Sequence, residues 1–471
     1  MILAIDQGTT GTTCLVVDAE LTPRGRGYRE FPQHYPQPGW VEHHPEDIWA
    51  SVLAAADEAL RSSGLRASAL QAIGITNQRE TTVLWNRRTG RPVAPAIVWQ
   101  DRRTAERCRE LPAELIRERT GLVPDPYFSA TKLEWLLERT DAHASELAFG
   151  TVDSWLVWKL TGGSTHVTDL TNASRTMLLD LDSLDWSDEL LELFRIDRAL
   201  LPRLAGSAEV VGEAELLGAT LPIAGIAGDQ QAALFGHGCF ERGQAKATYG
   251  TGSFVLAHAG TERRPPPAGL LETAAASGGY AFEGAILASG AAIQWLRDEL
   301  GVLTDAAESD RLARTVDSAG GVFFVPAFAG LGSPHWDADA RGLISGITRG
   351  TTGAHIVRAA LEGIAFQVAD VLDLLPGGVE MLRADGGASA NGFLMQFQAD
   401  LLGCPVEVAA EQETTALGAA ALAGRAIGLW PSDEAIRSRL RSGAVYEPAA
   451  DPDTAAASRA EWRAALRRAL L

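Results

Sequence analysis

The sequence predicts an α/β protein with two large domains. Short runs of apolar and often β-branched residues, such as residues 2–5, 14–17 and 72–75, alternate with longer segments of helical spacing. A chain of 471 residues is also longer than a single hydrophobic core usually accommodates. We place the division between an apolar segment ending at Phe240 and a strand-like segment starting at Ala247, which gives domains of residues 1–245 and 246–471.

Several segments have the spacing of helices. Pro45, Glu46 and Asp47 suit the first turn of a helix that continues with apolar residues on one face. Residues 355–375 and 414–430 combine helical spacing with many small residues, which permits close packing. Residues 458–471 form an amphipathic pattern, for which we expect a surface helix, with membrane association as the alternative.

Composition and charge narrow the classes of partner. Apolar residues make up 46% of the chain and charged residues 21%, which is typical of a globular enzyme. The formal net charge of -19 opposes nonspecific binding to nucleic acid or to an anionic membrane. The four cysteines are scattered, and neither a signal peptide nor a spanning apolar run is present. We therefore expect a cytoplasmic protein with no integral membrane association and no nucleic-acid partner.

A Gly/Thr loop near the N-terminus is suited to binding phosphate. In DQGTTG, residues 6–11, a strand ends and backbone N–H groups and the hydroxyls of Thr9 and Thr10 become available as donors, while Asp6 could hold Mg²⁺. The segment lacks the P-loop pattern, so a plain tight turn is the alternative. Similar Gly-containing turns at YGTGS, residues 249–253, and ADGGASANG, residues 384–392, would let a nucleotide approach the backbone.

A second group of residues is suited to binding a small polyol. Arg79 and Glu80 follow a short apolar strand, and a guanidinium beside a carboxylate can recognise neighbouring hydroxyls, although a solvated ion pair is the alternative. Trp99, Tyr127 and Phe254 could form the wall of a small pocket or simply belong to the core.

Asp229 is the candidate general base. It follows an apolar strand and precedes a helical pattern, so its carboxylate could project from the strand end and accept a hydroxyl proton, with Gln230 orienting the substrate. The alternative is that Asp229 only caps the following helix.

Taken together, these motifs resemble the FGGY family of carbohydrate kinases, and within it the members that act on glycerol. The resemblance runs from Met1 to about Trp430. It implies two actin-like (ribonuclease H-like) ATPase domains, each with a mixed central sheet flanked by helices, closing around a cleft. The matching segments include DQGTTG, PGWVEH, GITNQRETT, AIVWQDRRTAE, GLVPDPYFSATK, TNASRTML, GIAGDQQAALFG, YGTGSF, IQWLRDEL, DGGASANGFLMQFQADLLG and TTALGAAALAG.

The same resemblance implies an activity and a set of site residues. The activity is transfer of the γ-phosphoryl group of ATP to glycerol, with sn-glycerol 3-phosphate and ADP as products, Mg²⁺ as cofactor and a homodimer or homotetramer as the assembly. The implied polyol site consists of Arg79, Glu80, Trp99, Tyr127, Asp229, Gln230 and Phe254, with Asp229 as base. The implied nucleotide site consists of Thr9, Thr10, Gly11, Thr251, Gly290, Gln294, Gly387 and Asn391, with Asp6 placing the metal.

One departure from the family pattern concerns charge. Relatives of this type read DQGTTSSR, with an arginine near the phosphates, whereas this sequence has Thr13 at that position. A missing cation would weaken stabilisation of the transition state unless another group supplies the charge. Two alternatives therefore stay open: a kinase of the same family acting on another polyol or sugar, and a glycerol- and nucleotide-binding protein with impaired transfer.

Overall fold

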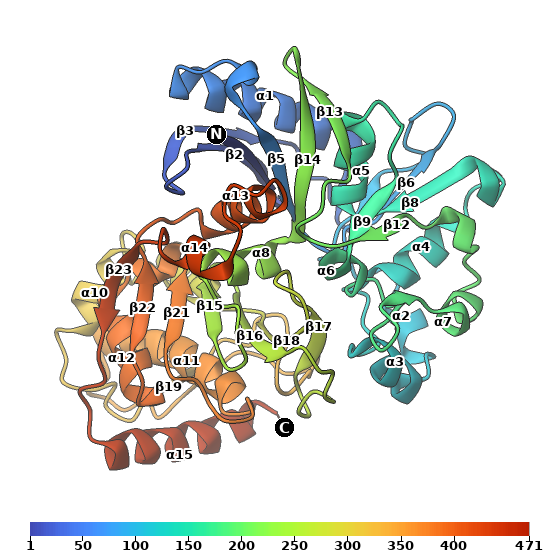
Figure 1. The fold of residues 1–471 in the computed structure, drawn as a ribbon. Coiled ribbons are helices and arrows are strands. Elements are labelled where there is room, and N and C mark those ends of the chain that lie inside the picture. Colours follow the sequence, from blue (N-terminus) through green and yellow to red (C-terminus); the bar gives the residue numbers. More distant parts are fainter. Residues whose placement is uncertain (471) are drawn as a thin grey trace.

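The computed structural model describes residues 1–470 and contains two large mixed β-sheets (Figure 1). The six-stranded sheet has the order β13-β14-β5-β1-β2-β3 and the seven-stranded sheet the order β17-β18-β16-β15-β21-β22-β23. The first sheet comprises β1 Ile2–Gln7, β2 Gly11–Val17, β3 Pro23–Glu30, β5 Ala72–Asn77, β13 Gly212–Leu216 and β14 Ala219–Gly228. The second comprises β15 Ala245–Tyr249, β16 Ser253–Gly260, β17 Leu271–Ala274, β18 Tyr280–Ile286, β21 Leu382–Asp385, β22 Val406–Ala409 and β23 Ser442–Tyr446.

The two sheets repeat one pairing pattern. In the first, β1 is antiparallel to β2 and parallel to β5; in the second, β15 is antiparallel to β16 and parallel to β21. The strands beyond them also correspond, because β14 and β22 continue the parallel part and β13 and β23 close it with an antiparallel strand. The β1–β2 and β15–β16 hairpins are therefore equivalent, and each carries one of the Gly/Thr turns noted in the sequence.

The first sheet is buried on both faces, which explains its nearly continuous apolar strands. Leu3 and Ile5 of β1 pack in a core with α1 (Pro45–Ser63) and α5 (Val152–Leu160). Ile2 and Ala4, which point the other way, pack with α13 (Thr414–Ala426). The predicted strands at 2–5, 14–17 and 72–75 and the predicted helix after Pro45 are confirmed.

Helix α13 joins the two halves of the chain. By sequence it lies far beyond residue 246, yet it covers the first sheet, where a Cβ on Gly74 would lie 2.1 Å from the carbonyl oxygen of Ala419. Gly225 of β14 is similarly close to Ala423. Figure 1 shows α13, in red-brown, beneath the blue and green strands of the first sheet. The small residues at 414–430 permit this close approach.

The second sheet is covered by C-terminal helices. Its core includes α9 Gly290–Asp298, α11 Gly353–Leu372, α12 Gly392–Leu402 and α15 Pro452–Ala469. In α15 the Trp462 ring stacks on Phe366 of α11 at 5.1 Å and its indole N–H donates to Asp370. The amphipathic C-terminal helix is confirmed, and its apolar face packs inside the protein rather than facing a membrane surface; Leu471 of the predicted segment lies outside the described residues.

The remaining elements surround these layers. Across residues 1–470 every helix is too short or too polar to cross a membrane. The additional strands are β4 Glu42–His43, β6 Val83–Asn86, β7 Ala96–Ile97, β8 Leu147–Gly150, β9 Val167–Asp169, β10 Leu179–Asp180, β11 Asp185–Trp186, β12 Arg203–Ala205, β19 Phe323–Val325 and β20 Leu343–Ser345. The additional helices are α2 Ala105–Arg109, α3 Ala113–Thr120, α4 Ser129–Leu137, α6 Leu170–Ala173, α7 Asp188–Leu193, α8 Asp229–Gly236, α10 Glu308–Ala313 and α14 Asp433–Arg437.

Candidate active site

The β1–β2 turn places a polar loop at the end of the first sheet. The N–H of Gly8 donates to the carbonyl of Gly11 at 2.9 Å, which closes the turn. The Thr9 hydroxyl accepts a hydrogen bond from the Trp99 indole N–H at 2.9 Å. Because a Cβ on Gly11 would lie 2.7 Å from the hydroxyl of Tyr28, only glycine fits this position without displacing that ring. The turn is thus fixed beside a residue of the predicted polyol site.

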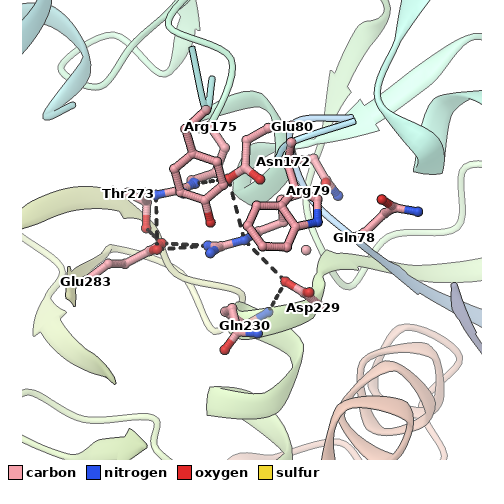
Figure 2. A network of polar contacts seen from close by, with 12 residues as sticks. Gln78, Arg79, Glu80, Asn172, Arg175, Asp229, Gln230, Thr273 and Glu283 are labelled. Carbon is pink, nitrogen blue, oxygen red and sulfur yellow. Dashed lines mark hydrogen bonds and ion pairs between the residues drawn. The ribbon is translucent and has the colours of Figure 1, made fainter. Parts of the chain in front are cut away.

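Arg79 lies at the centre of a buried polar network (Figure 2). Its Nη1 donates to Gln231 at 3.0 Å and to both carboxylate oxygens of Glu283 at 2.9 Å. Its Nε lies 3.2 Å from Oδ1 of Asp229. The alternative of a solvated ion pair at Arg79 and Glu80 is therefore wrong, because both side chains are almost fully buried.

Glu80 is held by its backbone and by a second arginine. It has a positive φ of 60°, an uncommon conformation for a residue other than glycine. The Nε of Arg175 donates to its carboxylate, and Ser129 donates to its carbonyl at 3.0 Å. Arg175 also donates to Glu283 at 3.1 Å, so the two arginines share two carboxylates. Such a network fixes the direction of each charged group.

The predicted polyol residues line one cavity of about 140 Å³. Its walls are Thr9, Arg79, Glu80, Trp99, Tyr127, Asp229, Gln230 and Phe254. Trp99 and Tyr127 face each other with ring centroids 5.6 Å apart. Phe254 belongs to β16 of the second sheet, whereas Arg79 and Asp229 follow strands of the first. The cavity therefore lies between the two halves of the molecule and combines charged groups with an aromatic wall.

Asp229 is placed at a strand end, as a base requires. It is the first residue of α8, directly after β14, and 29% of its side chain is exposed. Gly228 is the N-cap, and the Asp229 carboxylate accepts from the adjacent N–H of Gln230 at 2.7 Å. The alternative, that Asp229 is only the cap of this helix, is therefore wrong. Burial raises the pKa of Asp229, and Arg79 opposes that rise in part.

Asp6 lies among other carboxylates. Burial raises the pKa of Asp6 well above its usual range, and the negative charges of Asp229 and Glu413 raise it further. Within residues 1–470 we find no group of three or more His, Cys, Asp or Glu side chains arranged to hold a metal ion. A single carboxylate such as that of Asp6 is a donor that Mg²⁺ uses with nucleotides, where water and phosphate oxygens complete the coordination.

The turn of the β15–β16 hairpin and the glycine loop after β21 lie side by side at the second sheet. The N–H groups of Gly290 and Ala291 donate to the carbonyls of Gly250 and Thr251 at 2.9 and 3.0 Å. A Cβ on Gly386, which has φ +86°, would lie 2.6 Å from the carbonyl oxygen of Tyr249. The neighbouring Gly387 is exposed. The β15–β16 turn, the start of α9 and the loop after β21 therefore form one continuous backbone surface.

Two further predicted nucleotide residues extend this surface. Gln294 lies on α9 one turn after Gly290 and is exposed. Asn391 is the N-cap of α12, where its side chain accepts from the N–H of Leu394 at 2.9 Å and donates to Ser309 at 3.0 Å. Asn391 thus also has a structural role.

Four buried residues of the site escaped the sequence reasoning, and they are Arg175, Gln231, Lys246 and Glu283. Glu283 stands alone in an apolar strand, and burial would raise its pKa, but Arg175 and Arg79 lower it to about 2. Burial lowers the pKa of Lys246 to about 8, and its amine donates to Gln230 and Thr248. A charged residue inside an apolar strand pattern, such as Glu283 in YAFEGAI, is the signal that could have found these positions.

Two sheets with the same pairing pattern, equivalent Gly/Thr hairpins and a polar cavity between them define a class of two-domain α/β proteins with a ligand site between the halves. Comparison with family models identifies that class. The N-terminal domain of the FGGY family of carbohydrate kinases matches residues 1–236, and its C-terminal domain matches residues 245–427. The chain therefore belongs to the FGGY family of carbohydrate kinases, which confirms the resemblance seen in the sequence and the actin-like fold it implied.

Several individual relatives are similar to this chain over nearly its whole length. Glycerol kinase 2 of Thermotoga maritima is 51% identical, with 100% of this chain and 98% of the relative covered. Glycerol kinase of Deinococcus radiodurans is 51% identical over 99% of this chain and 97% of its own. The crystal structure of Plasmodium falciparum glycerol kinase with ADP has a TM-score of 0.93 and 35% identity, covering 100% of this chain and 98% of that one.

Proposed function

We propose that this protein phosphorylates glycerol with ATP, giving sn-glycerol 3-phosphate and ADP in the entry step of glycerol catabolism. The observation that carries the proposal is the cavity that brings Arg79, Glu80 and Asp229 together against an aromatic wall, in a chain half-identical to glycerol kinases over its whole length. The cavity's charged and aromatic sides match a molecule with three hydroxyls along one edge and carbon along the other.

Each side chain of the cavity has a defined part in binding. The guanidinium of Arg79 donates to hydroxyl oxygens, and the carboxylate of Glu80 accepts from hydroxyl protons. Because Glu283 and Arg175 already hold these two groups, little reorganisation is needed when glycerol binds. Trp99, Tyr127 and Phe254 cover the carbon skeleton, while Gln230 orients the hydroxyl that reacts.

Asp229 acts as the general base. Its carboxylate accepts the proton of the terminal hydroxyl as that oxygen attacks the γ-phosphorus of ATP and the bond to the ADP oxygen breaks. Positioning and charge stabilisation contribute most to phosphoryl transfer, and a well-placed base adds about 10²- to 10⁴-fold. The raised pKa of Asp229 makes this carboxylate a stronger base than an ordinary aspartate.

The nucleotide is assigned to the two hairpins and the loop after β21. Thr9, Thr10 and Gly11 offer donors to the phosphates from the first sheet, and Thr251, Gly290, Gln294, Gly387 and Asn391 bind ATP from the second. Asp6 would hold Mg²⁺ together with water and phosphate oxygens, and the ion supplies positive charge to the phosphates when bound. The burial of the Asp6 carboxylate near the carboxylate of Asp229 supports a cation there.

Three broader assignments belong to the same proposal: the domain division and the location rest on the sequence pattern, and the assembly rests on the family resemblance. The chain divides into an N-terminal domain of residues 1–245 and a C-terminal domain of residues 246–471. The protein assembles as a homodimer or homotetramer. It works in the cytoplasm.

An assay of ADP release across several polyols tests the function. Glycerol, xylulose, gluconate and erythritol are compared with wild-type protein, and Asp229→Ala serves as the control. We expect turnover on glycerol at least about 100-fold above that of the control, because the base is lost. Higher turnover on another substrate would favour the alternative of a different sugar kinase, and glycerol binding without any turnover would favour the binding-protein alternative raised by Thr13.

A further inference from the structure

The phosphate-binding turn has no basic residue close to it in the sequence. Between Met1 and Pro23 the chain contains neither lysine nor arginine, so the first basic residue is Arg24. Phosphoryl transfer spreads negative charge over the γ-phosphate oxygens, and fixed positive charges that face them stabilise the transition state. Any basic side chain that adds to the positive charge of bound Mg²⁺ must therefore reach this turn from another strand or from elsewhere in the fold.

Strand β3 brings two arginines to the correct face of the sheet. In the register, Asp6 is opposite Thr13, and Thr13 is opposite Tyr28. Gly25 and Gly27 of β3 lie directly against the backbone of α1. Because side chains alternate along a strand, Arg24, Arg26 and Tyr28 project from the opposite face, which is the face of Asp6 and Thr13.

Of the two arginines, Arg26 is the one that contacts the C-terminal half of the chain. Its Nε and Nη2 donate to the carboxylate of Glu413 at 3.0 and 2.8 Å. Glu413 immediately precedes Thr414, whose hydroxyl donates to Asp385 at the end of β21, next to Gly386 and Gly387. Arg24 instead pairs with Asp18, in the turn at the far end of the hairpin.

The partner of Arg26 lies where α13 meets the second sheet. Glu413 is the N-cap of α13, and the following Thr414 donates to Asp385 beside the predicted nucleotide loop. Arg26 is thus the basic side chain that pairs with Glu413 where β3 meets the start of α13. Half of the Arg26 side chain, 53%, is exposed, so the guanidinium also stays in contact with solvent.

We propose that Arg26 supplies, from β3, the positive charge for phosphoryl transfer that Thr13 on β2 does not provide. This inference rests on the proposed function. The guanidinium stabilises the negative charge of the nucleotide phosphates electrostatically and takes no proton. A purely structural role, in which the Arg26–Glu413 pair only fastens β3 to α13, makes different predictions.

The first test compares Arg26→Met with Arg24→Met. The two arginines lie on the same face of β3 and are 53% and 56% exposed, so Arg24→Met is a matched control. Removing one group that stabilises developing charge typically costs about 10²- to 10³-fold, and screening by water reduces this at a half-exposed site. We expect kcat/KM for ATP to fall about tenfold in Arg26→Met and less than about twofold in the control.

Two accompanying measurements separate charge from structure. Glycerol affinity, measured by calorimetry without nucleotide, should be unchanged in Arg26→Met, and Arg26→Lys should retain most of the activity. Glu413→Gln breaks the same ion pair but keeps the positive charge, so its kcat/KM for ATP should stay close to wild type. Equal losses in Arg26→Met and Glu413→Gln would overturn the proposal in favour of the structural role.

A rescue experiment gives the sharpest outcome. Thr13→Arg places a guanidinium on the neighbouring strand, opposite Asp6, and should restore most of the activity that Arg26→Met loses. If Arg26→Met has wild-type kcat/KM for ATP, or if the double variant is no better than the single one while both unfold at the wild-type temperature, the proposal is wrong. If the wild-type protein phosphorylates no polyol, the proposed function itself is wrong. That result differs from any change in kcat/KM of a variant relative to wild type, so the two failures are distinguishable.

Discussion

At the scale of single residues, the site depends on charges that are buried in pairs. Arg79 and Arg175 are almost fully buried, and both donate to Glu283. Leaving one charged member of such a network unpaired destabilises the folded protein. The complete network, in contrast, fixes the orientation of each charged side chain. Arg79 and Glu80, which line the cavity, are therefore held by Glu283 and Arg175, which do not line it.

The pH dependence of the reaction should reveal the environment of Asp229. A general base acts only when deprotonated, and burial raises the pKa of this carboxylate. Activity should therefore fall, as the pH is lowered, at a pH above the ordinary aspartate value of about 3.9. A profile of kcat/KM for glycerol against pH checks this, and a flat profile down to pH of about 4 would contradict it.

Replacing Glu283 with glutamine should destabilise the protein. Breaking a buried ion pair by removing one partner costs about 3–5 kcal/mol, because the arginine charges stay buried. We expect a loss of this size in the free energy of unfolding by urea, with Glu106→Gln, at an exposed position, as control. An unchanged midpoint of urea unfolding in Glu283→Gln would contradict this expectation. It would show that water solvates the charges of Arg79 and Arg175 once Glu283 is replaced.

The same residue sets a pH window for stability. The folded-state pKa of Glu283, about 2, lies below its ordinary value of 4.5, so the folded state favours the ionised form. Its contribution to stability is therefore complete above pH 4.5 and is lost as the pH falls toward 2. In Glu283→Gln, this part of the acid dependence should be absent.

At the scale of elements, one helix and two hairpins decide the arrangement of the site. The hairpins β1–β2 and β15–β16 are equivalent in the two sheets and carry the Gly/Thr turns. Helix α13 lies against the first sheet and begins beside Asp385 of the second. Residues far apart in the sequence are thereby brought to the edges of one cleft.

Adding a methyl group under α13 tests this packing. In Gly74→Ala the new Cβ would overlap the carbonyl oxygen of Ala419, so α13 must move away from β5. Overpacking of this kind typically costs about 1–3 kcal/mol. The melting temperature should fall, and kcat should fall with it because the start of α13 shifts. Gly350→Ala, whose nearest neighbour is 3.9 Å away, should leave both unchanged.

At the scale of the whole molecule, the two halves are not independent. The apolar core on one face of the first sheet includes Ala416, Leu417 and Ala420 of α13. A fragment of residues 1–245 would expose that face to water, although it contains every strand of the first sheet.

We therefore expect the fragment 1–245 to aggregate or to remain partly unfolded when expressed alone. Co-expression with residues 246–471 should recover a folded complex that phosphorylates glycerol. Circular dichroism and size-exclusion chromatography check both states. A monomeric fragment with cooperative thermal unfolding would show that α13 is dispensable for the first sheet.

Much of the site could be predicted because its chemistry is local. Each of these polar groups lies at or just after the end of an apolar strand: DQGTTG, the Arg79–Glu80 pair and Asp229. The sequence therefore predicts that their side chains lie at strand ends. Arg175 and Glu283 could not be connected with Arg79 in this way. Arg175 follows α6 and Glu283 lies in β18, and each is about a hundred residues or more from Arg79 in the sequence. Only folding brings the three side chains together.

The sequence by itself determined the alternation of strands and helices, the Gly/Thr turns and the kind of chemistry, because these depend on residue type and short-range spacing. The tertiary structure decided which charges face one another: it placed Arg26 beside Glu413, and α13 on the sheet of the other half. The physical reason is that contacts between segments far apart in the chain are decided by burial of apolar surface in the whole core, which residue type and short-range spacing do not encode.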